Sequence, residues 1–239
     1  MENLLKAMTI AAILAVLAFV QDDASAQEVV DLELVLAVDA SASVSNSEYR
    51  LQMDGIASAF RDPGVLKAIQ SGPLKRIGVA LVVWADAEDL KQTSDWFVIS
   101  NDSEAENFAQ LVAAFPREIN GGTGIGAGIL HAIDQLRNNR LVAARRVVDV
   151  SGDGMESDTE NFSLTVDYAR RAATDDRITV NGLAILTDVE DLDKWYLEHV
   201  ATGLGRFVMV ANNFVDFANA MKKKLIQEIQ YMPPVVLAE

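Results

Sequence analysis

Three oxygen-bearing side chains follow the apolar run Leu32–Val38, in the pattern Asp39-Ala-Ser41-Ala-Ser43. A buried parallel strand with this ending presents one carboxylate and two hydroxyls at its C-terminal edge, which is where open α/β sheets bind ligands. Oxygen ligands that include few carboxylates suit Mg²⁺ or a similar hard cation. Taken alone, the segment also fits a solvated loop whose serines cap the next helix.

Two later segments carry matching oxygen atoms. Thr123 lies between glycines just before an amphipathic helical pattern, and Asp153 lies between glycines after the apolar run Arg146–Val150. Thr123 alone fits a helix N-cap, and Asp153 alone fits a strand-to-helix turn. Three such loops at one sheet edge predict a site for one divalent cation, Mg²⁺ or another such as Mn²⁺ or Ca²⁺. The predicted metal ligands are Asp39, Ser41, Ser43, Thr123 and Asp153.

Apolar runs alternate with amphipathic segments along residues 27–230. This alternation predicts one doubly wound α/β domain with a mostly parallel six-stranded sheet, one antiparallel edge strand and helices on both faces. The predicted strands are Leu32–Val38, Arg76–Trp84, Trp96–Ile99, Arg146–Val150, Ile178–Ile185 and Arg206–Val210. The predicted helices are Ser47–Phe60, Ser103–Phe115, Gly126–Arg137, Thr159–Ala173, Asp191–Ala201 and Val215–Ile229. Two prolines end the last helix, which leaves residues 231–239 as a tail.

The first 26 residues have the pattern of a secretory signal peptide. Lys6 is followed by Ala7–Val20, which carries no charged residue, and Ala24-Ser-Ala26 fits a cleavage site. The apolar stretch is short against the ~20 residues that span a bilayer, so cleavage is favoured over a membrane anchor. We expect a mature chain that starts near Gln27, lies in the periplasm or outside the cell, and has no membrane insertion after cleavage.

Charge and composition exclude several classes of function. The formal net charge of −15 becomes −13 once the first 26 residues, with one Lys and three acidic residues, are removed. An acidic surface repels nucleic acids and anionic lipid headgroups, so we expect no nucleic-acid partner. The chain has no cysteine and two histidines, which argues against disulfides and a structural zinc site.

The three loops together resemble the metal-ion-dependent adhesion site (MIDAS) of von Willebrand factor type A (vWA) domains, and the likeness spans Leu32 to about Ile229. More narrowly, Arg146–Gly154, Val180–Ile185 and the closing Lys224–Ile229 resemble an exported bacterial family, domain of unknown function 1194, which is counted among vWA-like domains. The chain departs from the expected pattern in an acidic loop after Asp153 and in Leu204, where a proline is expected.

The resemblance implies a role for each predicted ligand. Ser41, Ser43 and Thr123 would bind the cation directly or nearly so, and Asp39 and Asp153 would act largely through coordinated water. Neutral hydroxyl ligands leave the ion most of its positive charge, and a carboxylate from a protein partner then completes the octahedron. The implied function is metal-dependent protein–protein interaction, without enzymatic activity. A structural envelope protein whose metal site stiffens the loops remains an alternative.

The sequence gives less support to enzymatic alternatives. A metal-dependent phosphoryl hydrolase commonly needs a second carboxylate two residues after Asp39 as general acid, and that position is Ser41. No nucleophile elbow surrounds either serine, and His131 and His199 both fall within helical segments. Gly122–Ala127 matches a dinucleotide fingerprint, but no buried strand precedes it.

The C-terminal helical segment Val215–Ile229 raises a question of regulation. In related vWA domains, ligand binding at the metal is coupled to movement of this helix. Its apolar stripe, which includes flexible Met221, and the polar Ala211–Asn213 ahead of it would permit such movement. A fixed helix that closes the sheet is the simpler alternative.

Overall fold

A seven-stranded sheet forms the centre of the computed structural model, which describes residues 27–157 and 160–231. Its four central strands are β2 (Glu33–Asp39), β3 (Ile77–Trp84), β7 (Arg146–Gly152) and β8 (Thr179–Ile185). They run parallel in the order β3-β2-β7-β8, and nearly all of their residues are buried. Near-continuous Val, Leu and Ile runs are typical of strands covered on both faces. The predicted fold class is therefore confirmed.

The sheet edges differ in detail from the prediction. Strand β9 (Val208–Ala211) extends the parallel side, and β5 (Phe97–Ile99) pairs antiparallel with β3 as predicted. A seventh strand, β4 (Gln92–Thr93), also pairs antiparallel with β3, and its two polar residues gave no strand pattern. A separate two-stranded sheet joins β1 (Glu28–Val30) to β6 (Leu141–Ala143).

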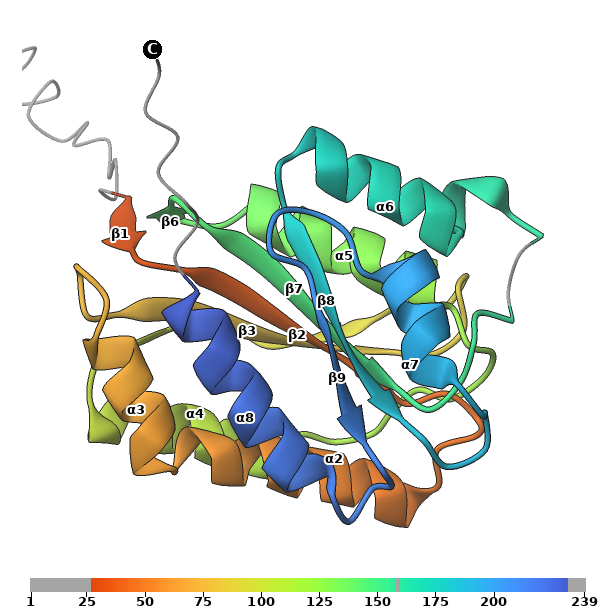
Figure 1. The fold of residues 1–239 in the computed structure, drawn as a ribbon, viewed down its shortest axis with the longest axis horizontal. Helices are drawn as coiled ribbons and strands as arrows, with labels where there is room; N and C mark the ends of the chain where they lie inside the picture. Colours follow the sequence, from red (N-terminus) through yellow and green to blue (C-terminus); the bar gives the residue numbers. More distant parts are fainter. Residues whose placement is uncertain (1–26, 158–159, 232–239) are drawn as a thin grey trace, which may run out of the picture.

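Helices cover both faces of the sheet (Figure 1). Alternate residues of β2 enter different apolar clusters, Leu34 and Leu36 on one face and Val35 and Ala37 on the other. The first face is covered by α2 (Asn46–Phe60), α3 (Pro63–Gln70), α4 (Asp102–Ala114) and α8 (Phe217–Gln230). The second face is covered by α5 (Ile125–Arg137), α6 (Val166–Asp175) and α7 (Leu192–Trp195).

Three helical segments were predicted incompletely. Helix α3 was missed, although Asp62 accepts from the Gly64 amide as its N-cap and Pro63 opens it. The predicted helix Thr159–Ala173 begins only at Val166, after the short 3₁₀ turn η1 (Phe162–Leu164). Helix α7 continues as a π-helical turn, η2 (Tyr196–Val200), which is an uncommon geometry.

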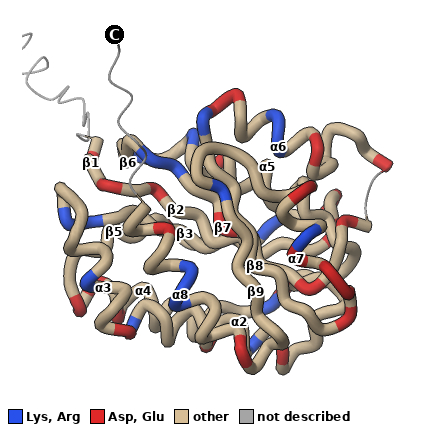
Figure 2. The backbone as a smooth tube through the Cα atoms, viewed as in Figure 1, with Lys and Arg blue, Asp and Glu red and all other residues tan. Residues whose placement is uncertain are grey.

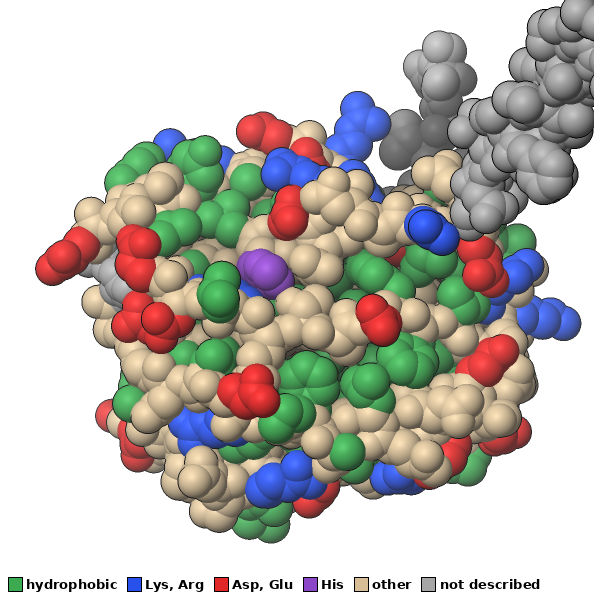
Figure 3. All heavy atoms as spheres, turned by 180° about the vertical axis from the view of Figure 1, so that it is seen from behind, with side chains coloured by type: hydrophobic (Ala, Val, Ile, Leu, Met, Phe, Trp, Pro, Cys, Tyr) green, Lys and Arg blue, Asp and Glu red, His purple; other side chains and the backbone are tan. Residues whose placement is uncertain are grey.

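No helix among the described residues is long and apolar enough to cross a membrane. The predicted signal peptide, residues 1–26, and nearly all of the predicted tail lie outside the described residues. Acidic side chains are spread over the face drawn in Figure 3, in keeping with the net charge of −15.

A buried ionic cluster joins α8 to the middle of the sheet. Lys224 of α8 is fully buried, and its Nζ lies 2.6 Å from Asp149 Oδ1 and 2.5 Å from Glu228 Oε1. Asn181 Nδ2 of β8 donates to the same Glu228 Oε1 at 2.8 Å. Burial and the neighbouring Glu228 carboxylate together raise the pKa of Asp149 to about 7. One cation therefore faces two carboxylates, and a proton on Asp149 balances the charge.

This balance predicts a specific pH dependence. Between the ordinary pKa of an aspartate, near 4, and about 7, the folded chain holds one more proton at Asp149 than the unfolded chain does. Its contribution to the free energy of unfolding therefore falls as pH rises through that window, by roughly 1 kcal/mol per pH unit, and is constant above it. Asp149→Asn should remove this part of the slope in urea unfolding between pH 4.5 and 7.5, whereas Asp54→Asn on the exposed face of α2 should keep it. Parallel profiles for wild type and Asp149→Asn would contradict the charge assignment.

Candidate metal centre

The candidate centre is built around Asp39, the last residue of the buried strand β2. Asp39 is 0% exposed, and its Oδ1 accepts a hydrogen bond from the Ser41 amide at 2.7 Å. Gln52 Nε2 of α2 donates to the Asp39 carbonyl at 3.0 Å, which fixes the backbone where the strand ends. Asp39 Oδ2 is buried and has no hydrogen-bond partner among the described residues. An unpaired buried carboxylate oxygen is costly, so this atom marks a place for a cation or a water bound to one.

The two serines connect Asp39 to Asp153. Ser41 is buried, and its Oγ lies 3.1 Å from Ser43 Oγ. Ser43 Oγ in turn donates to Asp153 Oδ1 at 2.8 Å. Strands β2 and β7 are neighbours, so the loops that follow them meet at the same sheet edge. Four of the five predicted ligands therefore form one connected set.

Thr123 belongs to the same region but is held by its backbone. Its amide donates to Ser157 Oγ at 2.9 Å, and its carbonyl accepts from the Ser157 amide at 3.0 Å. The N-cap of α5 is Gly124, without any side-chain cap, so Thr123 does not serve as the N-cap. Its Oγ1 makes no hydrogen bond within the described residues and is free to act as a ligand.

Hydrogen bonds tie the three loops to one another. The Ala42 amide donates to the Gly121 carbonyl at 2.8 Å and so joins the first loop to the second. Ser43 and Asp153 join the first to the third, and Thr123 and Ser157 join the second to the third. Each pair of loops is therefore linked directly. The oxygen atoms predicted from three distant stretches of sequence are brought together by this arrangement.

The electrostatics of the centre favour a bound positive charge. Burial raises the pKa of Asp39 to about 7, and burial also raises the pKa of Asp153, with the carboxylates of Asp188 and Glu48 adding to the shift. Burial raises the pKa of Tyr196 well above its usual value. No Lys, Arg or His side chain forms an ion pair with Asp39 or Asp153 in the part of the chain that the structure describes. A divalent cation would supply the missing charge.

Gly152 provides the room that this carboxylate needs. A Cβ atom at this position would lie 2.6 Å from the Tyr196 hydroxyl oxygen and 2.8 Å from Asp39 Oδ2. Such separations are far below normal contact, so only glycine fits between the tyrosine and the carboxylate. The Tyr196 hydroxyl, carried by the π-helical turn η2, is itself buried and finds no hydrogen-bond partner in the described part of the chain.

Sequence reasoning missed the residues that support these loops. Arg117 Nη2 donates to the carbonyls of Ala40 and Ser41 at 2.9 and 3.0 Å and so holds the first loop in place. Glu156 accepts from the amides of Gly126 and Val166, near the starts of α5 and α6. The acidic loop after Asp153 thus contains at least one carboxylate with a structural role. The sequence did not predict these contacts of Arg117 and Glu156, because their partners are backbone groups of other segments of the chain.

The donor set fits a hard cation of the Mg²⁺ type. It offers hydroxyls from Ser41, Ser43 and Thr123 and carboxylates from Asp39 and Asp153, all of them oxygen ligands. The described residues contain no group of three or more His, Cys, Asp and Glu side chains placed to hold a metal. Zinc and copper favour imidazole and thiolate ligands, whereas this set is made of hydroxyls and carboxylates.

Comparison with known families identifies the chain. Residues 28–233 match the family described as protein of unknown function (DUF1194), and the chain belongs to that family. No curated protein sequence matches it significantly.

Solved structures share the fold at low sequence identity. Proximal thread matrix protein 1 from the mussel byssus superposes with a TM-score of 0.59 at 15% identity, over 84% of this chain and 47% of the mussel protein. The pilus adhesin SpaC from Lactobacillus rhamnosus GG gives 0.59 at 15% identity, over 85% of this chain and 31% of SpaC. The vWF domain of the type V pili tip protein Mfa5 from Porphyromonas gingivalis gives 0.55 at 13% identity, over 86% of this chain and 98% of that domain. This chain thus spans less than half of the first two proteins, and the likeness shows a vWA-like fold.

Loss of one carboxylate should weaken cation binding. Asp153→Ala removes a charge and the acceptor for Ser43, so we expect Mg²⁺ affinity in calorimetry to fall by about 10- to 100-fold. Asp54→Asn removes one exposed acidic charge on α2 and should leave the affinity unchanged. Both variants should stay folded by circular dichroism, because Asp153 lies in the loop after β7 and Asp54 lies on the exposed face of α2. Unchanged affinity in both Asp153→Ala and Asp39→Ala would refute the assignment.

Cation binding should also weaken in acid. Because burial raises the pKa of Asp39 to about 7 in the metal-free chain, Mg²⁺ must displace a proton from it below that pH. The apparent Mg²⁺ affinity should therefore fall between pH 8 and pH 6, and calorimetry in two buffers of different ionisation enthalpy should detect the released proton. An affinity that is flat across this range would show that Asp39 is already ionised without metal.

Proposed function

We propose that this DUF1194 protein is an exported, divalent-cation-binding vWA-like domain that mediates metal-dependent protein–protein interaction. The observation that carries the proposal is the buried Asp39 Oδ2, which has no hydrogen-bond partner among the residues that the structure describes. It belongs to a connected set of serine hydroxyls and a second carboxylate. The vWA-like fold supports it, because the site lies where parallel strands end and loops project. The predicted export depends on residues 1–26, outside the described part.

The cation in this proposal serves binding rather than catalysis. Ser41, Ser43 and Thr123 are neutral, so a bound Mg²⁺ would keep a strong attraction for an anionic group from outside. A carboxylate on the partner protein is the group that completes such a coordination sphere. His131 bonds Thr93 at 2.7 Å rather than either serine of the centre, so it is not paired with them as a base.

Charge around the centre narrows the class of partner. Asp188 and Glu48 lie close enough to Asp153 to raise its pKa, and Figure 2 shows further acidic positions in the loop between β8 and α7. These carboxylates would repel a uniformly acidic partner. The partner's carboxylate is therefore proposed to stand among Lys or Arg side chains, which pair with this acidic surround.

Affinity capture tests the proposal. The tagged mature protein should retain a partner from cell-envelope extracts in Mg²⁺ and lose it in EDTA, and Asp153→Ala should lose it in both. Asp54→Asn should behave as wild type, and the interaction should weaken as salt rises, because the surrounding charges are solvent-exposed. A partner that is retained equally in EDTA would contradict a metal-mediated contact.

A structural role for the metal is the second candidate. A cation that binds only the folded chain stabilises it by mass action, by about 2.7 kcal/mol at one hundred times its dissociation constant. The direct ties between loops, such as Ser43 to Asp153, would tighten in this way. Mg²⁺ that raises the melting temperature while no partner depends on it would favour this role over partner binding.

A further inference from the structure

A cavity of about 400 Å³ lies at the edge of the sheet opposite the candidate metal centre. It is lined by residues from the starts of β7 and β8, from the turn before β9 and from the end of α8. The volume is within the range of small-molecule sites. Strand β7 runs from Arg146 at the cavity to Gly152 at the metal centre, so about 20 Å separates the two.

The walls of the cavity are apolar and held in place. Phe207, Leu204, Ile178 and Tyr231 are among the lining residues. The Tyr231 ring packs against Gly205, whose φ is +72° and where a Cβ would collide with the ring. The Arg145 guanidinium lies 5.4 Å from the centre of the same ring.

The floor is fixed by the buried ionic cluster of α8. Asn181 donates to Glu228 Oε1, and its Oδ1 accepts from the Phe207 amide at 3.0 Å. Lys224 Nζ lies 5.3 Å from the centre of the Phe207 ring. These contacts set the position of Phe207 before any ligand arrives, and a preorganised wall reduces the entropy lost on binding. Lys224 Nζ pairs with Glu228 Oε1 at 2.5 Å, so the floor offers a ligand no free positive charge.

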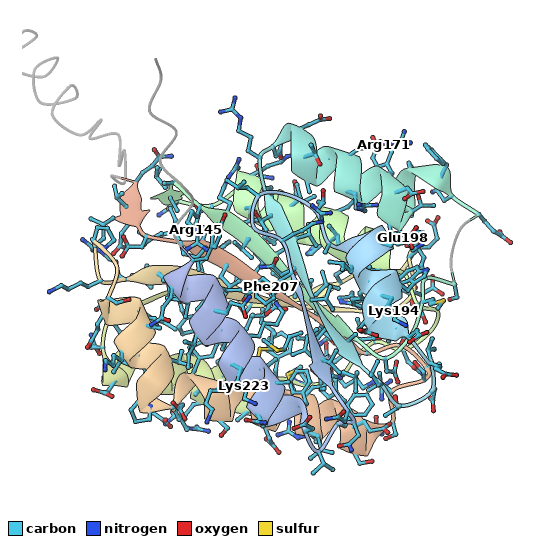
Figure 4. All side chains as sticks on the ribbon, viewed as in Figure 1. Arg145, Arg171, Lys194, Glu198, Phe207 and Lys223 are labelled. Carbon is cyan, nitrogen blue, oxygen red and sulfur yellow. The ribbon has the colours of Figure 1, made fainter. Side chains whose placement is uncertain are left out.

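The mouth, in contrast, carries three guanidinium groups. Arg145 donates to the carbonyls of Glu228 and Ile229 at the end of α8, and Arg146 donates to the carbonyl of Asp176. The Arg177 side chain is exposed and makes no hydrogen bond or ion pair with any other described residue. Figure 2 shows the basic stretch at the start of β7, and Figure 4 shows Arg145 and Phe207 near the C-terminal half of α8. This concentration of positive charge stands out in a chain of net charge −15.

We propose that this cavity binds a small amphipathic carboxylate, a ligand that neither the family nor the metal centre implies. The apolar body of the ligand packs against Phe207, Leu204 and Tyr231. Its carboxylate stays at the mouth, where Arg177 and the spare donors of Arg146 pair with it. Positive charge at the mouth and apolar walls further in give the ligand one orientation.

Octanoate is a suitable probe, with octanol and octylammonium as uncharged and cationic counterparts of the same length. All titrations use the full mature chain in EDTA, so that a carboxylate cannot bind through the metal centre. Calorimetry should give binding in the order octanoate, octanol, octylammonium, and Asp153→Ala should bind octanoate as wild type does. Octanol binding as tightly as octanoate would overturn the charge-based part of the proposal.

Two surface variants test the location. Arg177→Gln should weaken octanoate binding by about tenfold and leave octanol unaffected, because only the carboxylate loses a charged hydrogen bond. Lys223→Gln removes one exposed positive charge on α8, labelled in Figure 4, and should change neither. Leu204→Asp should weaken the binding of both octanoate and octanol, because it replaces an apolar side chain that lines the cavity and is 63% exposed. Equal losses in Arg177→Gln and Lys223→Gln would place binding elsewhere.

A shortened chain tests whether the cavity takes a separate ligand or the C-terminal residues of the same chain. Tyr231 lines the cavity, and residues 232–239 follow it in the sequence. A chain that ends at Tyr231 should bind octanoate no more tightly than the full mature chain. Binding by the shortened chain alone would show that these eight residues occupy the cavity, and absence of binding in both would also overturn the proposal.

Discussion

Burial of a carboxylate with no cation beside it is the constraint on which the candidate metal centre depends. Two neighbouring strands each bury an aspartate, and the surroundings of the two carboxyl groups differ. Asp149, in the middle of β7, faces Lys224 Nζ at 2.6 Å. Asp39, at the end of β2, accepts from the Ser41 amide, and its Oδ2 has no partner among the described residues. Asp149 thus lies beside a buried lysine, whereas no cation of the described residues pairs with Asp39, which favours a charge from outside at this second position.

The same constraint explains the geometry of the surrounding loops. If one cation is to contact ligands from three loops, the loops must lie close together. Direct backbone hydrogen bonds between loops, such as the one from the Ala42 amide to the Gly121 carbonyl, hold them at that distance. Gly152 is then required, because any side chain would fill the space between Tyr196 and Asp39. The first loop also needs Arg117 to satisfy its carbonyls. The buried carboxylate, the hydrogen bonds between the loops and the glycine at position 152 therefore all fit the same arrangement.

The sequence predicted what is local or strongly periodic. Buried strands such as β2 and β7 are continuous apolar runs, and the five predicted ligand residues follow strands or precede a helix at recognisable glycines. It did not predict the roles of Lys224 and Glu228, which look like ordinary solvent-facing charges of an amphipathic helix. Their partner Asp149 is more than seventy residues away, and only the fold brings the groups together. The short strand β4 and the π-helical turn η2 were missed for a related reason, since tertiary pairing rather than local pattern determines them.

The buried cluster also bears on whether α8 moves. A shift of α8 along its axis would separate Lys224 from Asp149 and Glu228 from Asn181 of the sheet, and hydrogen bonds to charged groups contribute about 1.5–3 kcal/mol each. Arg145 adds a second anchor, because it donates to the last carbonyls of the helix. At the other end of the helix, Phe217 packs against Gly55 of α2, where there is no space for a Cβ. A ligand that moved α8 would have to favour the shifted position by more than the loss of these contacts. The contacts therefore favour a fixed helix, and in the proposed function the metal centre would bind its partner without rearrangement of the fold.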